Sequence, residues 1–146
     1  MTNQYHEMSQ AEIEEFIQTP RFAVFGTNRL SGPPQLTPVW YLYENEKIYV
    51  SMFVESAKYK NLRRDTRGSI CVTGENPDAR SVIFSGTVEL FLKGSATWID
   101  DIVWRTVRRY YDSKKDAQLY LESEDNSKAS ALAVLSPERT IAQDYN

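Results

Sequence analysis

Six runs of strand-forming residues, separated by turn signals, constrain the fold of this chain more than any other feature. The runs cover residues 22–27, 35–43, 47–53, 69–73, 81–92 and 129–135. Strand–helix–strand alternation is too infrequent for a parallel nucleotide-binding sheet. Gly86, in the middle of the longest run, permits the bulge or sharp bend that a closed sheet needs. These patterns predict a mainly β fold with helices, of the α+β class, built as a small barrel.

Four segments with helical signals lie between the strands. Ser9 and Glu12 form a capping box that predicts a helix over residues 10–19, ending before Pro20. Further helices are expected at residues 57–64, 97–111 and 116–121. The third of these either covers a ligand pocket or thickens the core, and its apolar stripe favours the core.

Composition places the chain among ordinary soluble proteins. A length of 146 residues fits a single domain over residues 1–146, and 41% hydrophobic residues can fill its core. One cysteine cannot form an internal disulfide, and it lacks the partners of a metal site. No apolar run approaches the ~18 residues of a membrane span, and no signal peptide is visible. We therefore expect a cytoplasmic protein without a metal or a membrane partner.

The chain contains one histidine, and its position argues against side-chain catalysis. His6 lies in a polar N-terminal stretch, where we expect a solvated tail residue. A Ser-His-Asp triad or a multi-histidine metal site needs histidine inside a scaffold. We therefore assign no catalytic residue, and expect that an enzyme of this composition takes its chemistry from a cofactor.

A basic segment marks a candidate phosphate site. Residues 58–67 carry a net charge of +4, which leaves −7 on the rest of the chain. Ser56 can cap the following helix, whose free N–H groups and Lys58 would together bind a phosphate. The alternative is an ordinary solvated helix face. Nucleic-acid binding through this helix is not expected, because the acidic remainder of the chain would repel a long polyanion.

The run from Leu36 to Tyr41 could line a site for a flat ligand. Alternation places Thr37, Val39 and Tyr41 on one face and Leu36, Pro38 and Trp40 on the other. An apolar wall with a few hydrogen-bonding groups suits a flat aromatic ligand, but strand aromatics are often plain core. Pro38 also indicates an edge strand or a bulge.

Residues 35–41, 48–51 and 56–65 together resemble the pyridoxamine 5'-phosphate oxidase-like flavin-binding split barrels. Within that family, the similarity is greatest to small proteins described as FMN- or deazaflavin (coenzyme F-420)-dependent reductases. Residues 84–89 and 136–139 resemble the family's long strand and closing strand. The resemblance covers about residues 12–92 and 129–142, and the segment 93–128 matches nothing in it. It implies a six-stranded antiparallel split β-barrel that forms a homodimer with cofactor at the interface.

The resemblance also implies roles for individual residues. Lys58 would bind the cofactor phosphate, aided by Ser56, Asn61 and Arg63. The ring system would be lined by four consecutive residues of one strand and by Ser51 of the neighbouring strand. The four are Thr37, Pro38, Val39 and Trp40.

The function implied is that of an FMN-binding oxidoreductase that transfers a hydride to or from a small conjugated substrate. Many deazaflavin-binding relatives carry Arg at the position of Ser56, so FMN is favoured over F-420 as the cofactor. F-420 stays open as the alternative, because Lys60, Arg63 and Arg64 could serve its longer tail. A non-catalytic flavin-binding or interaction protein on the same barrel is the alternative function.

Overall fold

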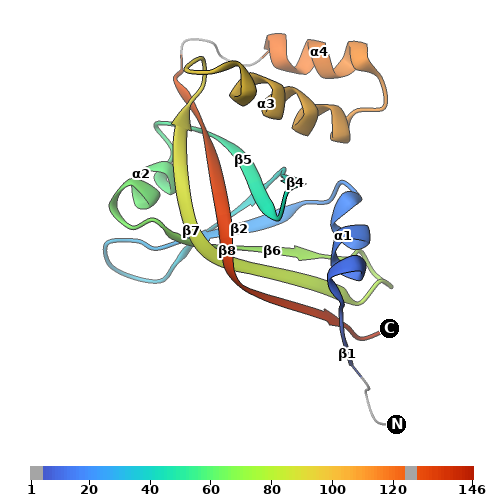
Figure 1. Ribbon diagram of the computed structural model, residues 1–146. Coiled ribbons are helices and arrows are strands. Elements are labelled where there is room, and N and C mark those ends of the chain that lie inside the picture. Colours follow the sequence, from blue (N-terminus) through green and yellow to red (C-terminus); the bar gives the residue numbers. More distant parts are fainter. Residues whose placement is uncertain (1–4, 124–127) are drawn as a thin grey trace.

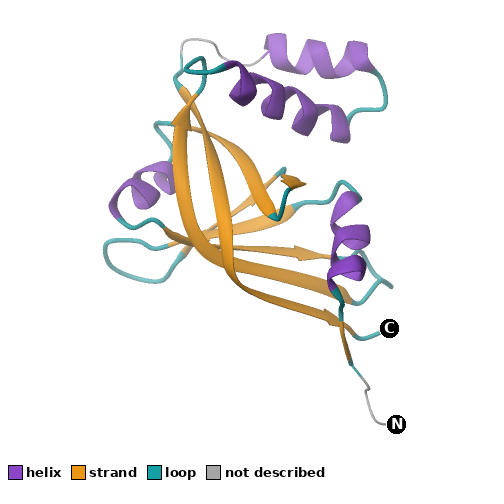
Figure 2. Cartoon of the chain, in the orientation of Figure 1, coloured by secondary structure: helices purple, strands orange, loops and turns teal. Residues whose placement is uncertain are grey.

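The computed structural model describes residues 5–123 and 128–146, which form an antiparallel β-sheet with four helices (Figures 1 and 2). The helices are α1 (Gln10–Gln18), α2 (Ala57–Arg64), α3 (Thr97–Tyr110) and α4 (Lys114–Ser123). The strands are β1 (His6–Glu7), β2 (Ala23–Thr27), β3 (Gln35–Val39), β4 (Leu42–Glu44), β5 (Lys47–Phe53), β6 (Arg67–Thr73), β7 (Arg80–Leu92) and β8 (Ser130–Asp144). The α+β class is as predicted.

The strands close into a barrel through a corner at Trp40 and Tyr41. The sheet follows the order β3-β2-β6-β7-β8-β5-β4, so its two ends are the consecutive strands β3 and β4. At the corner, the Tyr41 N–H donates to the Tyr110 hydroxyl and the Tyr41 carbonyl accepts from Arg109, both on α3. Because these bonds replace ladder bonds, the predicted strand over residues 35–43 is divided in two. With the short β1, the sheet has eight strands instead of the predicted six.

A bulge opposite Gly86 bends the two longest strands. The register shifts between Ser85 and Gly86, so that Ser85 pairs with Arg139 while Gly86 pairs with Pro137. A Cβ atom on Gly86 would lie 2.0 Å from the Ser136 carbonyl oxygen, which only glycine avoids. The predicted bend is confirmed, and Figure 1 shows β7 and β8 curving together. The predicted end of the last strand at residue 135 is wrong, because the bulge accommodates Pro137 and β8 continues to Asp144.

The helices of the first half begin where the sequence indicates. Ser9 and Glu12 form the capping box of α1, whose Ile13, Phe16 and Ile17 enter the barrel core. Helix α2 spans the predicted residues, and Ser56 is its N-cap. Pro38 lies on β3, an end strand of the sheet, as predicted. Among the helices of residues 5–123 and 128–146, none combines the length and apolarity that crossing a bilayer requires.

Helices α3 and α4 form an insertion between β7 and β8 that packs on the outside of the barrel (Figure 1). The barrel interior holds one hydrophobic core, which includes Ile48, Val50 and Phe84. A second cluster lies on the outer face, where Ile102 and Val103 of α3 are grouped with Leu132 and Val134 of β8, among others. The insertion therefore covers one outer wall of the barrel.

Candidate functional site

A cavity of about 300 Å³ lies between the outer barrel wall and the α3–α4 insertion. Strands β3 and β5, helix α2, the two inserted helices and the segments flanking β7 and β8 all contribute to it. Most of the lining is apolar or aromatic, and none of the described residues that line it is a carboxylate or a histidine. The lining consists of Phe22, Pro38, Val39, Trp40, Ser51, Met52, Phe53, Lys58, Lys93, Val103, Thr106, Val107, Tyr120, Leu121 and Ser130.

Lys58 brings a positive charge to this cavity from the first turn of α2. Its side chain is partly buried, and this burial lowers the pKa of the ammonium group. Ser56 holds the start of the helix: its hydroxyl accepts from the Tyr59 N–H at 3.3 Å and donates to the Phe53 carbonyl at 2.7 Å. The hydroxyl of Ser56 is thus engaged in fixing the β5–α2 turn that points Lys58 at the cavity.

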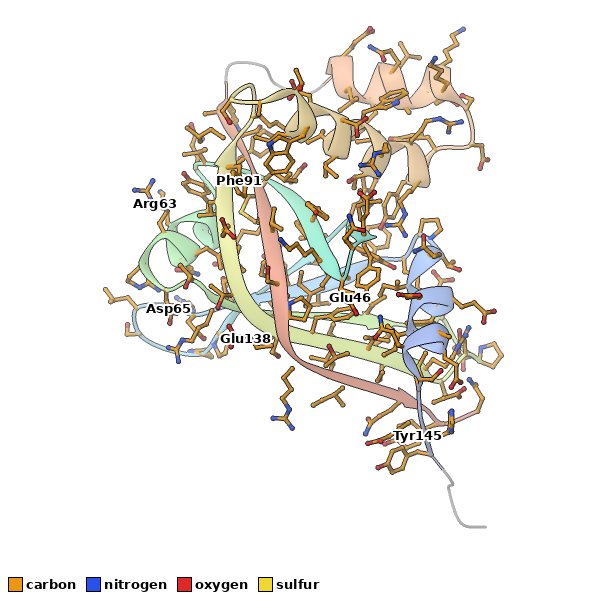
Figure 3. All side chains as sticks on the ribbon, in the orientation of Figure 1. Glu46, Arg63, Asp65, Phe91, Glu138 and Tyr145 are labelled. Carbon is orange, nitrogen blue, oxygen red and sulfur yellow. The ribbon has the colours of Figure 1, made fainter. Side chains whose placement is uncertain are left out.

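The other predicted residues of α2 lie away from the cavity. Asn61 is buried, and its amide nitrogen donates to Thr27 Oγ1 at 3.1 Å and to Gln35 Oε1 at 3.2 Å. It therefore ties α2 to β2 and β3. Arg63 is exposed and points outward from α2 in Figure 3, with one nitrogen 3.4 Å from the Tyr59 hydroxyl.

Of the six residues from Leu36 to Tyr41, for which alternation was predicted, three line the cavity. Pro38 and Trp40 reach the cavity, and Val39 also contacts it although its side chain packs in the barrel core. Thr37 pairs with the core residue Phe25 and is not among the lining residues. Ser51 of β5 faces outward and does line the cavity. Of the nine predicted binding residues, the fold brings five together here: Pro38, Val39, Trp40, Ser51 and Lys58.

Trp40 forms a fixed aromatic wall. Its indole stacks on the Tyr110 ring with centroids 4.6 Å apart and planes 7° from parallel, and the Tyr120 ring lies 5.2 Å away. The Tyr110 hydroxyl accepts from the Tyr41 N–H at 3.2 Å and donates to the Arg21 carbonyl at 2.7 Å. Burial raises the pKa of Tyr110 to about 12. The two hydrogen bonds of this hydroxyl hold the ring beside the indole.

The sequence left open whether the helix at residues 97–111 covers a ligand pocket or thickens the core, and it favoured the core. Val103 and Val107 follow each other by one helical turn and line the cavity with Thr106 of the same helix. The periodicity of this segment predicted its apolar stripe and favoured a core role. The helix performs both roles, because Val103 also packs in the outer cluster. No sequence signal placed Tyr120 and Leu121 of α4 opposite β3.

The arrangement can bind a flat apolar group that carries an anion. The Trp40 plane and the aliphatic side chains suit the flat group, while Lys58 and the start of α2 suit the anion. Among residues 5–123 and 128–146, no group of three or more His, Cys, Asp or Glu side chains could hold a metal ion.

Comparisons with solved structures identify similar folds. A conserved hypothetical protein, Rv2991 of Mycobacterium tuberculosis, is 25% identical, with a TM-score of 0.79 over 95% of this chain and 86% of that one. An FAD-binding protein of Mesorhizobium loti is 17% identical, with a TM-score of 0.71 over 97% and 96%. An F420 reductase is 16% identical, with a TM-score of 0.64 over 87% and 94%. No curated protein gave a match.

The family model described as Pyridoxamine 5'-phosphate oxidase matches residues 9–143, a range that runs from α1 through the insertion into β8. The resemblance seen in the strand around Trp40 and in the basic helix is thus confirmed over nearly the full chain. The chain belongs to the pyridoxamine 5'-phosphate oxidase-like family of split-barrel proteins.

Proposed function

We propose that the cavity binds a flavin-type cofactor, FMN in the first place and deazaflavin F-420 as the alternative, and that the protein is an oxidoreductase. One observation carries the proposal: Lys58, in the first turn of α2, faces an apolar, Trp40-walled cavity, and among residues 5–123 and 128–146 no carboxylate lines it. A lysine without a carboxylate nearby keeps its charge available for a phosphate. The FAD-binding protein and the F420 reductase of the same fold support this assignment.

The cofactor contacts follow from where the side chains lie. Lys58 would pair with the phosphate, and the first N–H groups of α2 would donate to it. Pro38, Val39, Trp40 and Ser51 would border the ring system. We propose that Thr37 contributes from the inner face of β3, at the edge of this site.

Two predicted residues would act at a distance from the ring. Asn61 would keep α2 in place through its bonds to Thr27 and Gln35. Arg63, which points outward, would be left for a longer anionic tail and gains importance if the cofactor is F-420. FMN, with a single phosphate, needs only the Lys58 end of the helix.

A bound flavin would supply the redox chemistry, in which a hydride passes to or from a small conjugated substrate. The residues of this chain orient the ring, hold the phosphate and exclude water, and none of the lining residues is assigned as a catalytic acid or base. Within the part of the chain that the structure describes, no His, Asp or Glu lines the cavity, and this observation equally favours a second candidate, a non-catalytic flavin-binding protein. Oxidation of a reduced nicotinamide by the flavin-loaded protein, with any acceptor, distinguishes the enzyme from the binding protein.

Fluorescence titration of the protein with FMN and with F-420 tests the proposal. We expect micromolar or tighter binding of one of them. Lys58→Met should weaken that binding 10- to 100-fold, or about 1.5–3 kcal/mol, because a charge-assisted contact is lost. For FMN the matched control is Lys60→Met, since Lys60 is an exposed residue of the same helix outside the lining; for F-420, whose longer tail could reach Lys60, the control is Lys47→Met, at an exposed position of β5 outside the lining. No binding of either cofactor, or equal effects of the two variants, would contradict the proposal.

We further propose that the protein is a homodimer, with the cofactor at the interface. An apolar row crosses the outer face of the barrel, with residues paired strand to strand from β3 to β8: Pro38, Val24, Cys71, Ile83 and Ile141. Leu36, beside this row, is 67% exposed, and Val24 is 39% exposed. An apolar sheet face of this kind is typical of a surface that a partner covers.

Light scattering after gel filtration tests the dimer. We expect twice the mass of one 16.9 kDa chain. Val24→Lys should shift the protein towards the monomer and lower its cofactor affinity, because the charge cannot be buried between two copies. Leu119→Lys, at an exposed position of α4, is the control and should leave the mass unchanged. A monomeric wild-type protein that binds its cofactor would refute the interface.

A further inference from the structure

On one side of the cavity, none of the lining residues has been assigned to the cofactor. The proposed cofactor residues come from β3, β5 and α2, whereas a separate set of side chains comes from the insertion. This set, called here the α3–α4 wall, consists of Val103, Thr106, Val107, Tyr120 and Leu121. A molecule that reaches the cofactor from this side must contact it.

The α3–α4 wall contains no Asp, Glu, Lys, Arg or His side chain that could pair with a charge. Three of its five members are aliphatic, and the other two, Thr106 and Tyr120, carry hydroxyl groups. The Thr106 hydroxyl is committed within its own helix, because it donates to the Ile102 carbonyl at 2.8 Å and the residue is buried. A charged group set against such a surface loses its hydration without compensation.

The wall also favours a flat shape. Tyr120 lies beside Trp40, with the two rings 5.2 Å apart and inclined by 43°. Tyr110 backs the indole from the other side, and its own hydroxyl is held by two hydrogen bonds. Aromatic surfaces fixed before binding recognise planar molecules at low entropic cost. The cavity of about 300 Å³ has to hold the cofactor ring as well, so the room that remains beside the wall suits only a small molecule.

We propose that the α3–α4 wall is a substrate-recognition site that selects small, flat, conjugated molecules without a net charge. The inference rests on the proposed function, since it places the substrate against the bound cofactor. The two lysines of the lining do not alter this selectivity in the loaded protein: the cofactor phosphate neutralises the charge of Lys58, and Lys93 already has an interaction within the protein. Cationic and anionic analogues are then both disfavoured by the apolar wall.

Calorimetric titration of the oxidised, FMN-loaded protein with three bicyclic probes tests the proposal without turnover. The probes are 2-naphthamide, which is neutral, 2-naphthoate, which is an anion of the same shape, and N-methylquinolinium, which is a flat cation. We expect 2-naphthamide to bind at least tenfold more tightly than either charged probe. If F-420 proves to be the cofactor, the protein loaded with F-420 takes its place.

Substitutions in the wall locate the binding. Leu121→Asn should weaken 2-naphthamide at least fivefold and leave the FMN dissociation constant unchanged. Leu119→Asn is the matched control, because Leu119 lies on the same helix with half of its surface exposed. Val107→Thr is a second variant, of the same shape as the wild type, that adds a hydroxyl group to the wall; it should act in the same direction, and urea unfolding checks that it is folded. Thr106→Val should not weaken the neutral probe, since its hydroxyl is already engaged.

Equal or tighter binding of 2-naphthoate or N-methylquinolinium would overturn the proposed selectivity. Equal effects of Leu121→Asn and Leu119→Asn would overturn the location. Both results concern protein that has bound its cofactor, so the proposed function survives them. Failure of the protein to bind FMN or F-420 at all would instead refute the proposed function, and this inference would fall with it.

Discussion

At the scale of single residues, His6 and Glu12 show how an expected tail residue acquires a structural partner. The chain's one histidine lies 3.0 Å from the Glu12 carboxylate, which also accepts from the Ser9 N–H in the capping box. The hydrogen bond with Glu12 raises the pKa of His6 above 6.5, and the bond with His6 lowers the pKa of Glu12 to about 2. No role in the candidate site follows, because the pair lies at the end of β1 and the start of α1.

The contribution of this pair to stability depends on pH from both sides. Because the pKa of His6 is higher in the folded state, protonated His6 stabilises the fold. This stabilisation is fully present below the unfolded pKa near 6.5 and is lost as the pH rises through the folded pKa. Because the pKa of Glu12 is lower in the folded state, ionised Glu12 stabilises the fold. This stabilisation is fully present above the unfolded pKa near 4.5 and is lost as the pH falls towards 2. The pair therefore contributes most between about pH 4.5 and 6.5.

Removing the charge of Glu12 should return the His6 pKa towards 6.5. In Glu12→Gln the amide oxygen can still accept from the Ser9 N–H, so the helix cap persists while the ion pair is lost. Proton NMR follows the titration directly, because the chain contains one histidine and gives one imidazole signal. Glu14→Gln, two residues away on α1, is the control. A raised His6 pKa in Glu12→Gln would show that another group holds the proton.

At the scale of elements, the sequence predicted local structure well and contacts between distant elements poorly. The capping box, the basic helix and the stripe of α3 depend on residues close in the chain, and all three agree with the structure. The short β1 and the second half of β8 depend on pairing with distant strands, and both were missed. The corner at Trp40–Tyr41 was also missed, because Arg109 and Tyr110 fix it from more than sixty residues away.

Tyr110, the last residue of α3, tests whether that helix positions the wall of the cavity. Tyr110→Phe keeps the ring stack but leaves the Tyr41 N–H and the Arg21 carbonyl without a partner, so we expect a loss of about 1–3 kcal/mol in the free energy of unfolding. Tyr110→Leu removes the stack as well. It should shift the Trp40 emission and weaken cofactor binding three- to tenfold, because the indole is no longer held flat.

Urea unfolding and cofactor titration separate the two effects of the Tyr110 variants. Trp98→Phe and Trp104→Phe in the background leave Trp40 as the fluorescent tryptophan. Tyr111→Leu is the control, since Tyr111 meets the indole only edge-on at 6.0 Å. If Tyr110 has only a structural role, both variants will be less stable, but the folded protein will bind the cofactor with unchanged affinity.

At the scale of the whole molecule, part of the candidate site was predictable. The charge of α2, the β3 alternation and the family resemblance pointed to five residues that the fold places at one cavity: Pro38, Val39, Trp40, Ser51 and Lys58. Five further lining residues belong to the insertion. Its residues were not predicted because helical periodicity shows which face is buried but not which wall of the barrel it covers.

The closure of the barrel depends on the bend at Gly86, which makes this residue the sharpest test of the architecture. A Cβ there would lie 2.0 Å from the Ser136 carbonyl oxygen and 2.9 Å from its carbonyl carbon, both in the backbone of β8. Neither atom can move aside as a flexible side chain could. Gly86→Ala must therefore force β7 and β8 apart at the bulge, and we expect a loss of about 3 kcal/mol or more, or protein that fails to fold.

Gly26→Ala gives the matched control, because a Cβ on Gly26 would meet its nearest neighbour, the Leu36 side chain, at an ordinary 3.4 Å. Its cost in urea unfolding should stay below about 1 kcal/mol. If both variants unfold at the same urea concentration, the bend does not require glycine. Gly86→Ala is expected to be less stable than Gly26→Ala. If it still folds, its cofactor affinity should be close to that of the wild type, because Gly86 does not line the cavity.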